Sequence, residues 1–407
     1  MLLVQKYGGT SVGNPERIRR VAKRVAAAQD AGHQVVVVVS AMGDTTDDLI
    51  NLVHEITDNP SEREMDVLLS TGEQVSMALL AMALKELSKP ALSLTGAQAG
   101  IQTDNSHSKA KILEINPERL QAELANGNIV VVAGFQGMDS LSDITTLGRG
   151  GSDTTAVALA AALKADVCEI YTDVDGVYTT DPRIVPEARK LNKISYDEML
   201  EMASLGAGVL HPRSVELGLK YGIPIHVRSS FNDNPGTIVK ESKANMEKSL
   251  AVTGVAYDSN VAKIGLYDVF DRPGIAYKLF KALSEAKVNV DMIVQSAMRN
   301  EINNISFTCS RGDLKKALEV VEQLMPELGS DGVTADDNVA KISIVGAGMV
   351  SNPGVAAQMF SALSEEGINL QMISTSEIKI SCIIQDSETH KAVKALHRAF
   401  NLAVGTK

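Results

Sequence analysis

The C-terminal part of the chain contains an internal repeat, and this repeat restricts the fold more than any other feature. Four blocks recur in the same order, and Pro273 and Pro353 show the spacing of 80 positions that most of them share. Each copy reads strand, Pro-Gly turn, helix, strand, strand, helix, strand, which is the pattern of a ferredoxin-like βαββαβ unit. A chance resemblance is the alternative, and the common order of the blocks argues against it. The blocks are 262–264, 272–274, 282–285 and 288–293, and their copies are 340–342, 352–354, 362–365 and 368–373.

The first 230 residues alternate short β-branched runs with longer helical patterns. This alternation predicts a largely parallel sheet covered by helices on both faces. Capping residues before prolines, at Asn14-Pro15 and Asn116-Pro117, mark two helix starts, and Ser195 with Glu198 matches a capping box. The expected strands are Leu2–Lys6, Val35–Ser40, Ala91–Leu94, Ile129–Ala133, Val167–Thr172 and Ile223–Val227.

Length and charge limit the class of protein. A chain of 407 residues is long enough for two or three domains, and a net charge of −11 argues against nucleic-acid binding. We find no charged, cleavable leader and no apolar run of the roughly 20 residues that cross a bilayer, so we expect a soluble, cytoplasmic protein. The expected parts are a first domain at 1–230, a linker at 231–249, and two repeat domains at 250–335 and 336–407.

The most specific motif is T-T-L-G-R-G-G-S-D-T-T at 145–155. Glycines followed by a helix start provide backbone N–H donors for an anion. Arg149 could hold a carboxylate through two parallel hydrogen bonds, and Asp153 could orient a substrate or a metal-bound phosphate. In the alternative, Ser152 and Asp153 only cap the helix, which leaves Arg149 between glycines unexplained.

Three further segments begin at the ends of expected strands, where open α/β sheets bind ligands. They are K-Y-G-G-T-S at 6–11, S-A-M-G-D-T-T-D at 40–47, and Y-T-D-V-D-G-V-Y-T-T-D-P-R at 171–183. In the first, two glycines permit close approach to an anion and Lys6 can reach phosphate oxygens. The third mixes hydroxyls, carboxylates and Arg183 in a way that suits a nucleotide. Ordinary turns remain the alternative for the first and third segments.

Gly72 interrupts an expected helix beside Glu73, at a cost of about 1 kcal/mol relative to alanine. A close backbone approach or a helix junction would justify that cost. Alternatively, Glu73 is one more solvated helix carboxylate.

Taken together, these motifs and the paired repeats resemble monofunctional bacterial aspartate kinases, over essentially the whole chain. The resemblance implies an amino-acid-kinase αβα sandwich followed by two ACT domains, with ATP and Mg²⁺ as cofactors and the Mg²⁺ held with ATP rather than by identified side chains. It implies catalytic roles for Lys6, Arg149 and Asp153. It assigns ATP to Lys6, Tyr7, Gly8, Gly9, Ser11, Thr172, Asp173, Tyr178, Asp181 and Arg183, and aspartate to Ser40, Thr46, Glu73, Arg149, Gly150 and Ser152.

The resemblance also implies feedback inhibition by lysine, threonine or both, and a homo-oligomer formed through the ACT domains. Some relatives make a separate small subunit from an internal start, for which Met246 is the candidate here. Many relatives carry a lysine where this chain has Gly208, so one phosphate contact is missing or comes from elsewhere. The candidate effector residues are Asp271, Gly274, Ala276, Asn289, Asp291, Gln295, Ile368 and Asn369.

Two rival functions remain at this point. One is phosphorylation of glutamate, carbamate or a nucleoside monophosphate by the same kind of kinase. The other is a non-catalytic amino-acid sensor that keeps a kinase-like scaffold.

Overall fold

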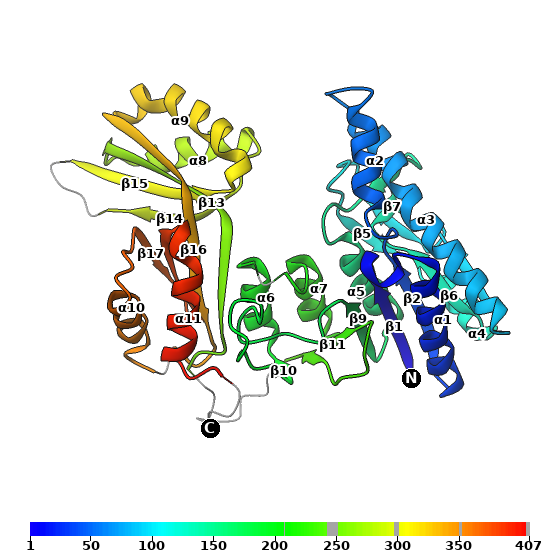
Figure 1. Ribbon diagram of the computed structural model, residues 1–407. Coiled ribbons are helices and arrows are strands. Elements are labelled where there is room, and N and C mark those ends of the chain that lie inside the picture. The colour runs from blue at the N-terminus through cyan, green and yellow to red at the C-terminus, as the bar shows by residue number, and fades with distance from the viewer. Residues whose placement is uncertain (207, 242–250, 297–300, 350–351, 404–407) are drawn as a thin grey trace. The chain divides into compact units, whose positions relative to one another are not determined.

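The computed structural model describes residues 1–206, 208–241, 251–296, 301–349 and 352–403 (Figure 1). Within these residues the chain forms two compact units. The first contains residues 1–177, 190–204 and 208–241, and the second contains residues 178–189, 205–206 and those from 251 onwards. Residues 242–249 of the expected linker, including Met246, lie outside the described residues.

The first unit is built on an eight-stranded sheet with the order β10-β12-β11-β9-β1-β2-β6-β3. The strands from β11 through β3 run parallel, and β12 is antiparallel to β11. All six strands expected from the sequence are present. The bounds are β1 Leu2–Tyr7, β2 Gln34–Val39, β3 Ala91–Leu94, β6 Ile129–Ala133, β9 Val167–Thr172, β10 Lys193–Ile194, β11 Ile225–Ser229 and β12 Thr237–Val239.

Helices cover both faces of this sheet, because its central strands are apolar on both sides. Val35–Val39 and Ile129–Ala133 are fully or almost fully buried, as strands between two helical layers should be. One face packs against α1 and α3, and α5 lies on the other (Figure 1). The helices are α1 Pro15–Asp30, α2 Thr45–His54, α3 Glu62–Glu86, α4 Glu118–Ala125, α5 Gly151–Leu163, α6 Tyr196–Ser204 and α7 Pro212–Tyr221.

The expected helix starts at Asn14 and Ser195 are confirmed by their hydrogen bonds. Asn14 Oδ1 accepts from the backbone N–H of Arg17 at 2.9 Å. Ser195 and Glu198 form the reciprocal capping box, with the Glu198 N–H donating to Ser195 Oγ at 3.2 Å. In contrast, α4 begins at Glu118 with Pro117 at its N-cap position and no side-chain cap, so Asn116 is not the N-cap residue that was predicted.

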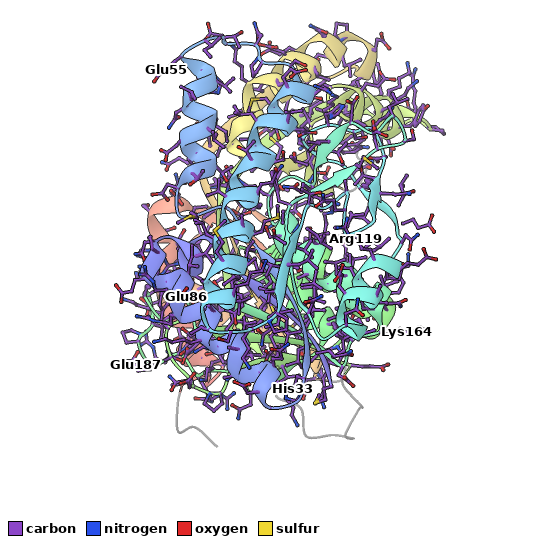
Figure 2. The ribbon with its side chains drawn as sticks, turned by 90° about the vertical axis from the view of Figure 1, so that its right-hand side faces the viewer. His33, Glu55, Glu86, Arg119, Lys164 and Glu187 are labelled. Atoms are coloured by element: carbon purple, nitrogen blue, oxygen red, sulfur yellow. The ribbon has the colours of Figure 1, made fainter. Side chains whose placement is uncertain are left out.

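α3 is long and apolar enough to cross a membrane by length and composition alone. Half of its most apolar window is buried inside the unit, and it carries the buried carboxylates of Asp66 and Glu73. We therefore interpret α3 as a core helix. It runs beside α2, and Figure 2 labels Glu55, which follows α2, and Glu86, the last residue of α3.

A second, four-stranded sheet with the order β5-β4-β7-β8 lies in the same unit and was not expected. Its strands are three or four residues long and mix polar with apolar side chains, so no strand period is visible in them. The bounds are β4 Ile101–Thr103, β5 Ile112–Ile115, β7 Gln136–Met138 and β8 Ile144–Thr146.

The second unit contains the two repeats around a six-stranded sheet with the order β14-β15-β13-β16-β18-β17. Helices α8 and α9 pack on the first repeat, and α10 and α11 on the second. The bounds are β13 Gly254–Phe270, α8 Ile275–Glu285, β14 Val290–Gln295, β15 Ile302–Cys309, α9 Leu314–Leu328, β16 Gly332–Val345, α10 Val355–Glu365, β17 Met372–Thr375, β18 Lys379–Gln385 and α11 Thr389–Ala399.

The repeats share their strands in a way that the sequence pattern does not express. β13 and β16 are long, and each contributes one half to each repeat. The start of β13, Gly254–Asp258, pairs with the end of β16 and stands where a last strand of the second copy was expected. Among the described residues no strand follows α11, since Ala403 forms only an isolated bridge with Ala188.

Candidate functional site

The loop after β1 is joined to the loop after β2 by backbone contacts. The Gly43 N–H donates to Gly9 O at 3.1 Å, and a Cβ on Gly9 would lie 2.9 Å from Ala41 O. Only glycine permits this approach. Ser11 Oγ donates to Ser230 Oγ at 2.9 Å, which ties the same loop to the segment after β11. The predicted phosphate loop therefore lies at the carboxyl edge of the parallel strands.

Lys6 points from β1 toward the start of α5. Its Nζ lies 2.7 Å from Asp153 Oδ1, and the two side chains are only 12% and 11% exposed. A cation and a carboxylate with so little solvent between them interact more strongly than a surface pair. The structure thus brings together two of the three residues predicted to be catalytic.

The G-R-G-G segment forms a tight turn into α5. Gly148 and Gly150 have φ values of 76° and 68°, a conformation that favours glycine. Gly150 is the residue before the helix, and no side chain caps this helix start, so the reading of Ser152 and Asp153 as an N-cap pair is wrong. Arg149 is exposed and has no partner among the described residues, which leaves its guanidinium available for a ligand.

Glu73 is buried rather than solvated, with an exposed fraction of 3%. Its Oε1 accepts from the Ala41 N–H at 3.0 Å, while Oε2 is buried without a hydrogen-bond partner in the part of the chain that the structure describes. Burial raises the pKa of Glu73 to about 7. α3 continues through Gly72, where a Cβ would lie 2.8 Å from Ala41 Cβ, so close approach and not a helix junction explains this glycine.

Ser40 and Thr46 lie on either side of the same loop. The Ser40 N–H donates to Tyr7 O at 3.1 Å, and Ser76 Oγ donates to Ser40 O at 2.7 Å. Thr46 lies in the first turn of α2. The residues predicted for aspartate therefore come from the end of β2, from α2 and α3, and from the glycine turn with the start of α5, all within one unit.

The residues predicted for ATP are divided between the units. Thr172 and Asp173 follow β9 in the first unit, whereas the segment 178–189, with Tyr178, Asp181 and Arg183, belongs to the second. Within that unit the Arg183 guanidinium is held by Asp181, with Nη2 2.7 Å from Oδ2, and it lowers the pKa of Asp181.

The side chain of Tyr7 is not accessible to ATP. Its ring is fully buried and stacks on Tyr171, with ring centroids 4.7 Å apart. Only its main chain is therefore available to a ligand.

Two residues near the glycine turn carry no signal in the sequence. Phe135 follows β6 with a φ of 70°, a strained conformation for a bulky residue, and a Cβ on Gly151 would lie 2.8 Å from its ring. Asp66 is fully buried on α3 and accepts from the Ser108 N–H at 3.0 Å. Both depend on tertiary contacts, so neither could be read from spacing.

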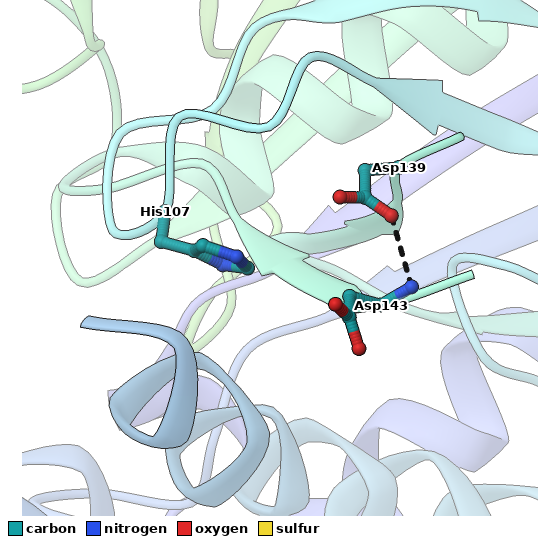
Figure 3. Close-up of side chains that lie close together, drawn as sticks. All are labelled: His107, Asp139 and Asp143. Carbon is teal, nitrogen blue, oxygen red and sulfur yellow. Dashed lines mark hydrogen bonds between the residues drawn. The ribbon is translucent and has the colours of Figure 1, made fainter. Parts of the chain in front are cut away.

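His107, Asp139 and Asp143 have ligand atoms within 4.8 Å of one another (Figure 3). Each is already used. Asp139 Oδ1 accepts from the backbone N–H groups of Leu141 and Asp143, both at 2.9 Å. The guanidinium of Arg63 binds Asp143 at 2.6 Å, and His107 Nδ1 lies 2.8 Å from Asp66. We interpret the group as a braced turn.

A cavity of about 350 Å³ lies in the first repeat, at the turn between β13 and α8. Four of the predicted effector residues line it, namely Asp271, Gly274, Ala276 and Gln295. It also contains Asn303, whose Oδ1 is buried without a described partner. Four predicted effector residues are not part of its lining, namely Asn289, Asp291, Ile368 and Asn369.

Asp291 instead pairs with the buried amine of Lys341, and Lys263 pairs with Gln371. These two contacts join the repeats to each other reciprocally, because Lys263 and Lys341 occupy equivalent positions.

Comparison with known proteins decides the family. The amino acid kinase family model matches residues 1–229, and an ACT domain model matches residues 268–324 and 342–400. The aspartokinase of Mycolicibacterium smegmatis is 55% identical over 98% of this chain and 96% of its own length. The chain belongs to the aspartokinases of the amino acid kinase family.

Solved aspartokinases share the fold. E. coli aspartokinase III in complex with aspartate and ADP has a TM-score of 0.84 at 26% identity, over 98% of this chain and 99% of that one. The same enzyme in complex with lysine and aspartate has a TM-score of 0.75, with the same identity and coverage. The expected αβα kinase domain and ACT domains are thereby confirmed.

Proposed function

We propose that this aspartokinase transfers the γ-phosphoryl group of ATP to the β-carboxylate of L-aspartate, giving 4-phospho-L-aspartate and ADP. The observation that carries the proposal is the Lys6–Asp153 pair beside a glycine turn whose Arg149 is exposed and pairs with no described residue. Phosphoryl transfer asks a protein mainly for positioning and for positive charge near the phosphate oxygens. The aspartate and ADP bound to E. coli aspartokinase III support both substrates.

Aspartate would be held by charges of both signs. Arg149 would bind the α-carboxylate through two parallel hydrogen bonds. The unpartnered Oε2 of Glu73 would accept from the α-ammonium group, which restores the charge that burial disfavours. The β-carboxylate is then left free to attack phosphorus.

The phosphoryl step would proceed in line. A β-carboxylate oxygen forms a bond to the γ-phosphorus, and the bond from that phosphorus to the β–γ bridging oxygen breaks with its electrons moving to ADP. Lys6 and the backbone N–H group of Gly9 would face the phosphate oxygens, whereas the N–H of Gly8 already donates to Tyr171 O at 3.2 Å. Mg²⁺ bound with ATP would neutralise further phosphate charge, and Asp153, beside Lys6, would be the carboxylate that orients it.

Regulation would come from the cavity of the first repeat. Its carboxylate, amides and backbone groups suit an amino acid, and the lysine bound to E. coli aspartokinase III supports lysine as an effector. Threonine is the other candidate. Inhibition by lysine or threonine would suit an enzyme that catalyses the first step toward lysine, threonine and methionine. The enzyme would work in the cytoplasm as a homo-oligomer.

The segment 178–189 would couple effector binding in the repeats to nucleotide binding by the kinase. Ile184, Val185 and Ala188 are buried in the core of the second repeat. Thr179 Oγ lies 3.0 Å from His397 Nε2, and the Val255 N–H donates to Thr179 O at 2.7 Å. A repeat that shifts on binding an effector would therefore shift the predicted nucleotide residues Tyr178, Asp181 and Arg183.

The test is ADP release measured with ATP, Mg²⁺ and a panel of acceptors: aspartate, glutamate, carbamate and a nucleoside monophosphate. We expect release only with aspartate, and inhibition by lysine, threonine or the pair. Release with another acceptor alone identifies another kinase of this family, and binding of lysine without any release identifies a sensor.

A further inference from the structure

The start of α7 lies directly behind the glycine turn. A Cβ built on Gly150 would lie 2.2 Å from His211 Cγ, so the imidazole packs against the backbone of that glycine. Two residues on, Arg213 Nη1 donates to Leu147 O at 2.6 Å and Nη2 donates to Ala110 O at 3.0 Å. One guanidinium thus joins the glycine turn to the loop before β5.

Different neighbouring groups pack against each glycine of the turn. A Cβ on Gly148 would lie 3.0 Å from Ser108 O, and Phe135 stands against Gly151 as described above. Leu147 is fixed on both sides, since its N–H donates to Phe135 O at 2.8 Å while its carbonyl accepts from Arg213. The conformation of the turn is therefore fixed by the side chains and carbonyl groups around it.

His211 contributes packing by an uncharged imidazole rather than a positive charge. Burial lowers its pKa, nearby Asp153 opposes that shift, and its Nδ1 is buried with no hydrogen-bond partner among the described residues. The backbone carbonyl of His211 accepts from Ser214 Oγ at 2.6 Å, which fixes the first turn of α7.

We propose that His211 and Arg213 are positioning residues that hold residues 147–151 in the shape that binds aspartate. The proposal rests on the proposed function, because it assigns their effect to the aspartate site. A displacement of about 1 Å in such a segment is enough to cost on the order of 10²-fold in rate. Neither residue needs to touch a substrate.

Lys220 offers a matched control. It lies on the same helix and lines the same small cavity as Arg213, but it is exposed and bonds neither carbonyl. Arg213→Gln and Lys220→Gln each remove one cation from this cavity, and only the first removes the bridge between the two loops. Arg213→Lys keeps the charge and one donor, so it should lie between wild type and Arg213→Gln.

The experiment combines steady-state kinetics with amide hydrogen exchange on the full chain. For Arg213→Gln and His211→Ala we expect the KM for aspartate to rise at least about tenfold while the KM for ATP stays within about twofold. Amides 147–153 should exchange faster in both variants, and Lys220→Gln should match wild type. Equal effects of Arg213→Gln and Lys220→Gln, or unchanged exchange at 147–153 in His211→Ala, overturn the proposal.

The ADP-release assay tests the proposed function separately from the role of His211 and Arg213. A wild type that releases no ADP with aspartate ends that function, while the exchange measurement still decides whether α7 braces the turn. If Arg213→Gln does not fold, His211→Ala and Arg213→Lys decide it by the same two measurements.

Discussion

Lys6 Nζ lies 2.7 Å from Asp153 Oδ1, although the first residue belongs to β1 and the second to the first turn of α5. The pair closes the edge at which the phosphate loop and the glycine turn meet. Removing one partner of so buried a pair leaves an uncompensated charge on the other.

We therefore expect Lys6→Ala to lower turnover by at least about 10²-fold, as loss of a charge that stabilises the transition state should. The exposed Lys23→Ala on α1 is the control and should keep wild-type turnover. Initial rates of ADP release at saturating ATP and aspartate measure the difference. Near-normal turnover in Lys6→Ala would remove Lys6 from the mechanism.

Glu73 should make aspartate binding dependent on pH. Because burial raises its pKa to about 7, the carboxyl group is protonated below that pH and cannot pair with an ammonium group. The KM for aspartate should fall as the pH rises through 7 and level off above it. In Glu73→Gln the KM should be higher and this step absent, and a step that persists in the variant would assign it to another group.

Gly72 should be needed because it lets α3 approach Ala41 closely, and not because α3 needs a glycine to form. Gly72→Ala gains about 1 kcal/mol of helix propensity, yet its methyl group would press on Ala41 Cβ and move Glu73. We expect a rise in the KM for aspartate of about tenfold. The double variant Gly72→Ala with Ala41→Gly removes the clash and should restore the KM, whereas no restoration would contradict the contact explanation.

Asp271 should separate inhibition from catalysis, since it lines the cavity of the first repeat. Asp271→Ala should keep kinase activity and weaken inhibition by lysine or threonine by at least about tenfold, the usual scale for losing a charged hydrogen bond. Asp337→Ala removes an exposed acid from the same unit and serves as the control. An unchanged inhibitor titration would count against the cavity as the effector site.

The sequence predicted those parts of the fold that depend on local pattern. The valine run of β2 and the cap at Asn14 need only neighbouring residues to be recognised, and both were found. For Gly72 the cost of a glycine inside a helix indicated either a close approach or a helix junction, and the structure shows the close approach.

The parts that were missed depend on contacts between distant segments. β4, β5, β7 and β8 are too short to show a period, and Asp66 is buried only because α3 meets the loop at 107–108. The segment 178–189 looked like a continuation of the first domain. Its membership of the second unit comes from Ile184 and Val185, which pack among residues more than 60 positions away.

The most direct measurement of the central claim is capture of the product with hydroxylamine, which converts an acyl phosphate into a hydroxamate. With ATP, Mg²⁺ and aspartate, we predict aspartate β-hydroxamate in an amount equal to the ADP released, and its loss in Lys6→Ala. ADP release without any hydroxamate, or formation of the α-hydroxamate, would contradict phosphoryl transfer to the β-carboxylate.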